Sequence, residues 1–298
     1  MKFTTLANAL LFAGTVAAAP GTAMRRARAT RQSKPMIPVD GITALDGPNN
    51  SHVEYSGNWA GAVLVGTGYT SVTGTFTVPS PTTDGSGSAW VGIDGDTCGT
   101  AILQTGIDWT RSGSKTTYDA WYPDYAYDFS GISLAAGNVV TVTVTATSKT
   151  GGTAVIKNTS TGKTVTHTFS NEASLGSLCE YNAEWIVEDF DSGGSQVSFA
   201  NFGTVSFTGA SAVQSGTTVG VTGASIIDIK QDTTVLTDCS LSGSSGVTLS
   251  GYAGHLVCSA CGGGLSSTLP SLDRGVCILP ATEEAIEPQP SVSKLPHR

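Results

Sequence analysis

The chain is organised around residues 90–109, which read Trp90-Val-Gly-Ile-Asp-Gly-Asp-Thr-Cys-Gly-Thr-Ala-Ile-Leu-Gln-Thr-Gly-Ile-Asp-Trp109. Most of the remaining sequence is Ser, Thr, Gly and Val in strand-like alternation, whereas this stretch concentrates carboxylates, tryptophans and Gln104 among apolar residues. Asp94-Gly-Asp96 predicts a turn, and residues 101–107 predict the strand that follows it. An amide buried without partners costs a few kcal/mol, so Gln104 is either a satisfied core amide or part of a functional site.

Strand-like segments continue on both sides of this stretch. They are short, alternate in hydropathy and are separated by Gly, Pro, Asn and Ser turn signals, and no segment has helical periodicity. The series predicts an all-β fold, an antiparallel two-sheet β-sandwich. Asn158-Thr-Ser is interpreted as a glycosylation acceptor in a loop. Besides residues 101–107, the expected strands cover residues 58–64, 71–78, 118–123, 124–129, 139–147, 164–169, 183–190, 197–202, 205–207, 219–221, 225–230 and 247–252, with a loop at 79–87.

The two ends of the chain predict an exported precursor. Residues 1–18 have the layout of a signal peptide, with an apolar run too short to span a bilayer. Residues 19–52 carry prolines and a basic cluster and are interpreted as a propeptide, with a disordered linker as the alternative. Residues 53–252 form the expected β-sandwich domain, and 253–298 a Cys/Gly/Pro-containing, disordered tail. We therefore expect a secreted, extracellular protein that does not associate with membranes.

Charge is distributed unevenly along the chain. Residues 1–50 hold six of the 15 Lys and Arg residues and two of the 23 acidic residues, so the remainder carries 9 basic and 21 acidic residues and a net charge of −12. Such a surface argues against binding nucleic acid or anionic membranes. At neutral pH the basic segment is expected to lie over the acidic domain, and to be released as carboxylates protonate.

The six cysteines of an exported chain are disulfide candidates. Their spacing does not determine the connectivity. Cys258-Ser-Ala-Cys261 is not accompanied by a second CxxC or by a spaced His pair, so no metal site is expected.

Carboxylates are the reactive groups that remain. The four histidines are poorly placed for catalysis, and no Gly-x-Ser-x-Gly elbow is present, which argues against Ser-His-Asp chemistry. Glu184 and Glu188 share one face of the predicted strand 183–190. Four residues along a strand span about 13 Å, which is too far for a glycosidase carboxylate pair. On the strand pattern alone, Glu188 is either a solvated or salt-bridged residue or a catalytic one.

Several motifs resemble those of the fungal glutamic peptidases, the eqolisins, most closely the aspergilloglutamic peptidase type. The motifs cover residues 90–98, 101–106, 118–122 and 182–190, in the family's order. The resemblance implies two seven-stranded antiparallel sheets, synthesis as a secreted proenzyme and endopeptidase activity in acid. It also implies a disulfide between Cys98 and Cys179. Its site residues would be the catalytic Gln104 and Glu188, with Trp59, Trp90, Asp94, Asp119 and Trp121 lining or supporting the substrate cleft.

This pair of side chains suits peptide hydrolysis. Glu188 as a carboxylate can take a proton from water and return it to the leaving nitrogen. Gln104 can orient that water with its amide oxygen and hold the oxyanion with its NH₂ group. The expected partners are protein or peptide substrates and the chain's own propeptide as inhibitor. The mechanism requires no metal or organic cofactor, and the protein is expected to be a monomer.

Two features depart from the family. The chain passes from Trp121-Tyr122 directly to Pro123, where relatives have a further Glu-Trp-Tyr, and it has a cysteine-bearing tail after Tyr252. The shortened loop leaves a second hypothesis open. In that alternative the protein is a catalytically weakened or inactive β-sandwich that binds peptide or glycan through Trp59, Trp90 and Trp121.

Overall fold

The computed structural model describes residues 31–39, 53–122 and 127–256 of the chain. These residues form strands and one 3-10 turn, η1 (Ala173–Leu175), so the all-β prediction is confirmed. Within the same ranges no helix has the length and apolar character needed to cross a membrane. The expected signal peptide, the Pro123 loop and nearly all of the C-terminal tail lie outside the described residues.

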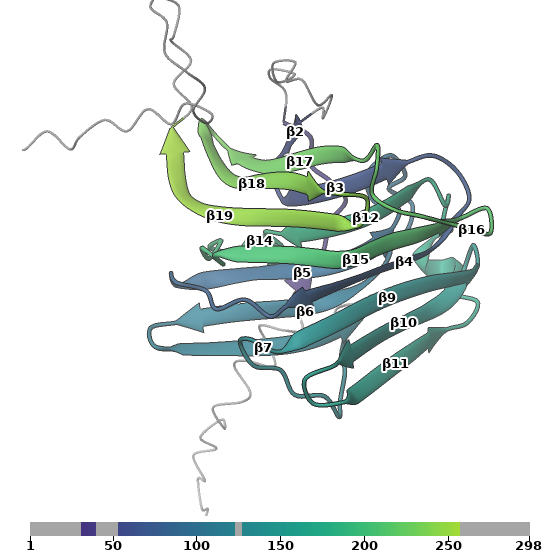
Figure 1. Ribbon diagram of the computed structural model, residues 1–298, viewed down its shortest axis with the longest axis horizontal. Coiled ribbons are helices and arrows are strands. Elements are labelled where there is room, and N and C mark those ends of the chain that lie inside the picture. The colour runs from purple at the N-terminus through teal and green to yellow at the C-terminus, as the bar shows by residue number, and fades with distance from the viewer. Residues whose placement is uncertain (1–30, 40–52, 123–126, 257–298) are drawn as a thin grey trace, which may run out of the picture. The chain divides into compact units, whose positions relative to one another are not determined.

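Hydrogen-bonded strands follow one another in a single long path, which Figure 1 shows from β11 and β10 through β9 and β4 to β15 and β19. All pairs on this path are antiparallel, and only the side strand β2 (Val53–Ser56) pairs in parallel, with β17. The strands in order of pairing are β11 (Lys163–Phe169), β10 (Gly151–Asn158), β9 (Val139–Ser148), β4 (Tyr69–Thr77), β15 (Thr204–Gln214), β19 (Gly246–Leu256), β18 (Thr234–Ser242), β17 (Ser225–Gln231), β3 (Trp59–Val65), β12 (Asn182–Glu188), β5 (Gly85–Ile93), β6 (Leu103–Ser112), β7 (Lys115–Tyr122) and β8 (Tyr127–Asp128).

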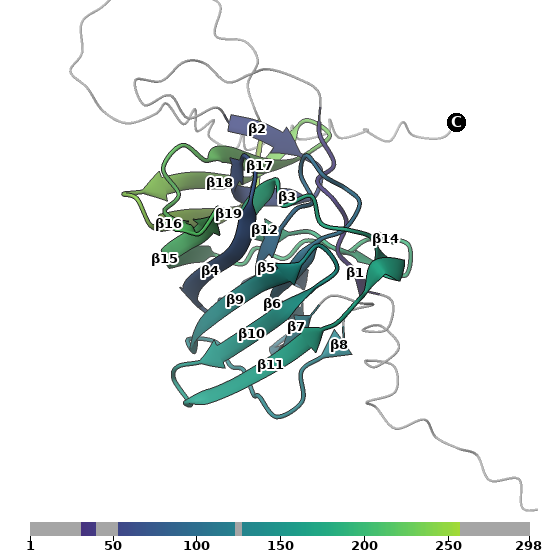
Figure 2. The ribbon, with the colours of Figure 1, turned by 90° about the vertical axis from the view of Figure 1, so that its right-hand side faces the viewer.

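The path folds back on itself, so that one part covers the other. Strands β4, β9, β10 and β15 pack against β5, β6 and β12, and Figure 2 views β9, β10 and β11 in front of β5, β6 and β7. Because the β17–β18 hairpin joins the two parts into one ladder, the expected pair of separate seven-stranded sheets is not confirmed. The short strand β16 (Thr217–Val219) adds to β15, and a small separate sheet contains β1 (Arg31–Gln32), β13 (Asp191–Ser192) and β14 (Ser195–Gln196).

Strand β12 is buried along its whole length and separates two apolar clusters. Trp185 belongs to the large cluster between the packed layers, whereas Ile186 belongs to a smaller cluster on the other side of the strand. This division follows from the period of two in a strand. We call the second surface the tryptophan face; its buried apolar residues are Trp59, Val63, Trp90, Trp121, Ile186 and Ile227.

Several strand predictions were wrong for identifiable reasons. The expected loop at 79–87 ends early, because β5 begins at Gly85 despite its Gly-Ser-Gly-Ser composition. The expected strand 197–202 forms just one bridge, at Phe199. Phe199 packs against Phe202, which packs against Trp109, so these rings join the core instead of pairing along a ladder. Strands β10 and β18 were not expected, since neither has a clean hydropathy alternation bounded by strong turn signals.

Two sequence expectations about side chains have clear outcomes. Cys98 and Cys179 form a disulfide, as the family resemblance implied, and Cys239 is a buried free thiol. Asn158 is fully buried, and its amide donates to the Ser133 carbonyl and to Asn138 Oδ1. A glycan cannot be attached to this nitrogen in the folded chain, so the glycosylation prediction was wrong.

Candidate active site

Glu188 lies at the end of β12 and is completely buried. Its carboxylate accepts hydrogen bonds from Trp90 Nε1 at 2.9 Å, from Ser33 Oγ at 2.7 Å and from the backbone N–H of Lys34 at 3.1 Å. Burial raises the pKa of Glu188 to about 7, although the charge of Arg31 and these hydrogen bonds pull it down. The site thus holds a carboxyl that titrates near neutrality against a stretch of extended peptide.

Gln104 lies on β6 and is nearly buried, with 5% of its surface exposed. In the sheet it is paired with Gly92 of β5, whereas Glu188 is paired with Ser88 of the same strand. Gly92 and Ser88 are four residues apart on β5, so they face the same side of the sheet. Their partners Gln104 and Glu188 therefore point to that same face, as the proposed mechanism requires.

The register also separates these two side chains along the sheet. They are two strands apart and offset by four residues, which in a flat sheet would place their Cα atoms about 16 Å apart. The Trp90 indole spans much of this interval. At one end its Nε1 donates a hydrogen bond to Glu188. At the other end its ring lies over Gly92: a Cβ added to Gly92 would be 2.8 Å from Trp90 Cζ3 and 3.3 Å from Gln104 Cβ.

The other predicted tryptophans belong to the same face. Trp59 is paired with Glu188 and meets the Trp90 ring edge-on at 4.9 Å, and Trp121 lies on the neighbouring part of the face in β7. The indole N–H groups of Trp59 and Trp121 have no hydrogen-bond acceptor within the described residues. Asp119 is paired with Asp108 across β7 and β6. The three tryptophans thus lie in one cluster, and their role in a substrate cleft stays a prediction.

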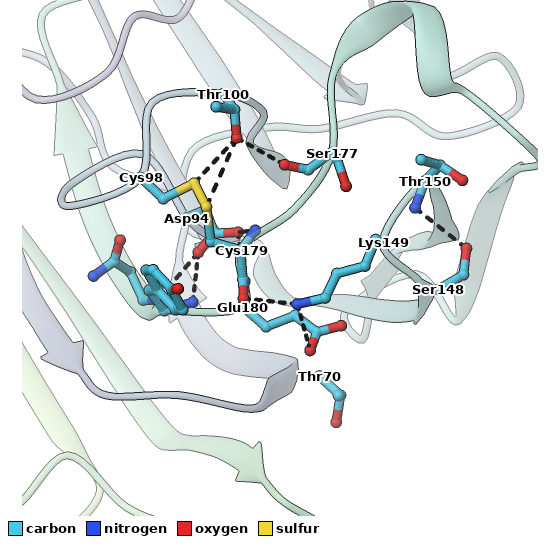
Figure 3. Close-up of polar contacts among 12 residues, drawn as sticks. Thr70, Asp94, Cys98, Thr100, Ser148, Lys149, Thr150, Ser177, Cys179 and Glu180 are labelled. Atoms are coloured by element: carbon cyan, nitrogen blue, oxygen red, sulfur yellow. Dashed lines mark hydrogen bonds and ion pairs between the residues drawn. A yellow bond between two sulfur atoms is a disulfide. The ribbon is translucent and has the colours of Figure 1, made fainter.

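Asp94 has a different surrounding from the other predicted site residues. Its buried carboxylate accepts four backbone N–H groups, from Cys179, Glu180, Tyr181 and Asn182, at 2.7–3.2 Å. Figure 3 shows this carboxylate beside the Cys98–Cys179 disulfide. Asp94 therefore supports the site by anchoring the segment that leads into β12.

The same neighbourhood contains three residues of types that can ligate a metal. Ligand atoms of Asp94, Cys98 and Cys179 lie within 4.8 Å of one another. The two sulfurs are bonded to each other, and both carboxylate oxygens already accept backbone N–H groups. The group is therefore occupied by its own structural bonds.

Residues 31–39 lie across this site, with Arg31 in a pocket of opposite charge and aromatic rings. The guanidinium donates to Asp108 Oδ2 at 2.6 Å and to Ser88 Oγ at 3.2 Å. It also lies 3.9 Å from the Trp121 ring centre and 4.9 Å from that of Phe190. A buried ion pair stacked on aromatic rings fixes this end of the segment firmly.

The rest of the segment is held by main-chain and side-chain contacts. Strand β1 pairs with β13, and Lys34 forms an ion pair with the buried Asp191. Further along, Met36 N–H donates to the Gly95 carbonyl, and Met36 packs against the tryptophan face. The segment thus runs over Glu188 in an extended form, as a bound peptide would.

Sequence reasoning missed Ser88, Asp108 and Phe190 as site residues. Asp108 could have been found, because it lies four residues after Gln104 on one strand and therefore shares its face. The partners of Asp108 could not, since they come from β1, β5 and β7 and meet only in the folded sheet.

The chain is similar to several known proteins. The profile of the peptidase A4 family matches residues 57–251. Aspergillopepsin-2 from Aspergillus niger is 50% identical over 279 residues, which cover 82% of this chain and 98% of that protein. Scytalidopepsin B from Scytalidium lignicola is 42% identical over 259 residues, with 82% and 98% covered. The crystal structure of scytalido-glutamic peptidase with a transition state analog inhibitor matches with a TM-score of 0.60 at 45% identity, covering 66% of this chain and 98% of that chain. The chain belongs to the peptidase A4 family.

Proposed function

We propose that this chain is a secreted glutamic endopeptidase that hydrolyses peptide bonds of proteins in acid, with Glu188 and Gln104 as its catalytic residues. The observation that carries the proposal is the peptide seated on Glu188, whose backbone N–H at Lys34 lies 3.1 Å from the buried carboxylate. A substrate bound in the same way would present its amide nitrogen to that carboxyl. The peptidase names of the similar proteins support the reaction type.

Each catalytic residue has a distinct task in this mechanism. Glu188 as a carboxylate removes a proton from water as the water attacks the peptide carbonyl carbon. The Gln104 NH₂ group holds the oxygen that becomes negative. Glu188 then returns the proton to the nitrogen, and the C–N bond breaks. An amide does not titrate, so Gln104 keeps its role at a pH where a second carboxylate would be neutral.

Residues 31–39 support a proenzyme. They fall within the expected propeptide 19–52, and they cover Glu188. While they are in place, burial holds the pKa of Glu188 at about 7, so the carboxyl is neutral in acid and cannot act as a base. Departure of the segment would open the site to substrate and water. It would relieve the burial that raises the pKa of Glu188, and it would also remove the Arg31 charge and the Ser33 and Lys34 hydrogen bonds that lower it.

Acid would also loosen the segment. The segment is held by two ion pairs, Arg31 with Asp108 and Lys34 with Asp191. Ion pairs with carboxylates weaken in acid. We therefore propose that this segment inhibits the enzyme before secretion and leaves the site in an acidic medium.

The test measures digestion of a denatured protein at acid pH by the secreted chain and by two variants. Glu188→Gln and Gln104→Ala should each reduce kcat by about 10²-fold or more, since each removes a group that acts on the transition state. Glu180→Gln, which changes a partly exposed carboxylate paired with Lys149, is the control and should retain full activity. Near-wild-type digestion by either catalytic variant would exclude this assignment.

A further inference from the structure

Three buried oxygen atoms near Gln104 have no hydrogen-bond partner within the described residues. They are Gln104 Oε1 and both carboxyl oxygens of Glu184. Glu184 is fully buried, and Gln104 is 5% exposed. A buried polar atom without a partner costs about 1–3 kcal/mol, so three of them in one place call for a functional or structural explanation.

The sheet register brings these two side chains toward each other. Glu184 and Gln104 are both paired with Gly92, one from each side of β5. Gly92 has no side chain to separate them. The place where its Cβ would stand is 3.2 Å from Glu184 Oε2 and 3.3 Å from Gln104 Cβ. Glu184 therefore reaches over the glycine into the space beside the Gln104 amide.

The surroundings of Glu184 favour its neutral, protonated form. The charged groups that act on it are Asp96, Asp94 and Glu188, all of them acidic. Burial raises the pKa of Glu184 well above its ordinary value, and the charges of Asp96 and Asp94 raise it further, while the backbone N–H of Asp96 opposes the shift without reversing it. A protonated carboxyl has an O–H donor, which a carboxylate lacks.

We propose that Glu184 is a positioning residue for Gln104, donating its carboxyl proton to Gln104 Oε1 so that the amide NH₂ group faces the scissile carbonyl. The inference depends on the proposed function, because it assigns Gln104 the role of oxyanion donor. The carboxamide can turn by half a rotation about its last bond, which exchanges oxygen and nitrogen. A donor at Oε1 selects one of the two orientations. The amide oxygen has a second lone pair and can still accept from the attacking water.

The test compares two variants that match Glu184 in size. Glu184→Gln replaces the O–H donor with an N–H donor, whereas Glu184→Met fills the same space without any donor. Secreted full-length chains are activated in acid, and kcat and KM are measured on a peptide substrate. Glu184→Met should lower kcat by at least about 10-fold with KM within about 2-fold, since only the orientation of Gln104 changes. Glu184→Gln should recover most of that loss.

The outcomes separate this inference from the function on which it depends. If Gln104→Ala and Glu188→Gln abolish activity while Glu184→Met keeps the wild-type kcat, the positioning role is refuted and the enzyme assignment stands. If the Gln and Met variants lose kcat equally, while thermal unfolding shows that both are folded, a donor at position 184 is not what matters and the inference also fails. If Gln104→Ala is fully active, the proposed function itself is wrong.

Discussion

Asp228 makes the stability of this protein depend on pH, and one substitution should remove that dependence. Its side chain is buried in β17, where it accepts a hydrogen bond from Thr237 Oγ1 at 2.9 Å. Burial raises the pKa of Asp228 from 3.8 to about 7, with the Thr237 bond opposing the shift. The folded chain therefore binds a proton at Asp228 more tightly than the unfolded chain does.

The sign follows from that difference. Below about pH 4 the carboxyl is neutral in both states, so its contribution to stability is complete. Between pH 4 and 7 the unfolded chain has lost the proton and the folded chain still holds it, so stability falls as pH rises. A displacement of about three pKa units corresponds to roughly 4 kcal/mol, all of which is lost above pH 7.

Asp228→Asn removes this dependence, because an amide stays neutral and its oxygen can still accept the Thr237 bond. Thermal unfolding is measured for the purified chain and the variant at several pH values between 4 and 8. The variant should have a similar Tm at pH 4 and a Tm roughly 10 °C higher at pH 8, since 1 kcal/mol corresponds to about 2–4 °C in a domain of this size.

The exposed Asp232, in the turn after β17, provides a matched control. Its backbone has a positive φ of 51°, a conformation that Asn tolerates, so Asp232→Asn should shift Tm equally at all pH values. If Asp228→Asn also shifts Tm by the same amount at pH 4 and pH 8, the raised pKa of the buried carboxyl is not what governs stability there.

Three further predictions concern the site and its supports. Gly92→Ala puts a methyl group 2.8 Å from Trp90 Cζ3 and should lower kcat at least about 10-fold, whereas Gly87→Ala, equally tight against Trp109 on the opposite face, should mainly lower Tm. Arg31→Gln removes a charged hydrogen bond and a cation–π contact that hold residues 31–39 on the site, about 3 kcal/mol in total. After a shift to acid, the full-length variant should therefore lose most of the lag before activity appears; an unchanged lag would contradict this. Replacing both Cys98 and Cys179 with Ser opens a loop with a sequence separation of 81 and should lower stability by about 3–4 kcal/mol, measured by denaturant unfolding; an unchanged midpoint would show that the Asp94 hydrogen bonds suffice.

The sequence by itself determined the strand character and the two faces of each strand. A period of two placed Glu184 and Glu188 on one face of β12 and Trp185 on the other, and the structure has them so. The acidic domain and basic N-terminal segment also followed from the sequence, because charge is a property of composition. The start of β5 shows where composition misleads. Its Gly/Ser-rich sequence pointed to a loop, because glycine carries no side chain to mark a buried face, yet these residues pair as a strand.

Tertiary structure alone decided which side chains meet. Register is set by pairing between strands far apart in the chain, and a strand pattern is unchanged by sliding along its neighbour. Only the fold therefore places Gln104 opposite Glu184 across Gly92, while Asp108 lies in the row of Glu188. The same holds for Arg31. The sequence shows its positive charge, but its carboxylate and aromatic partners lie on separate strands that only the folded sheet brings together.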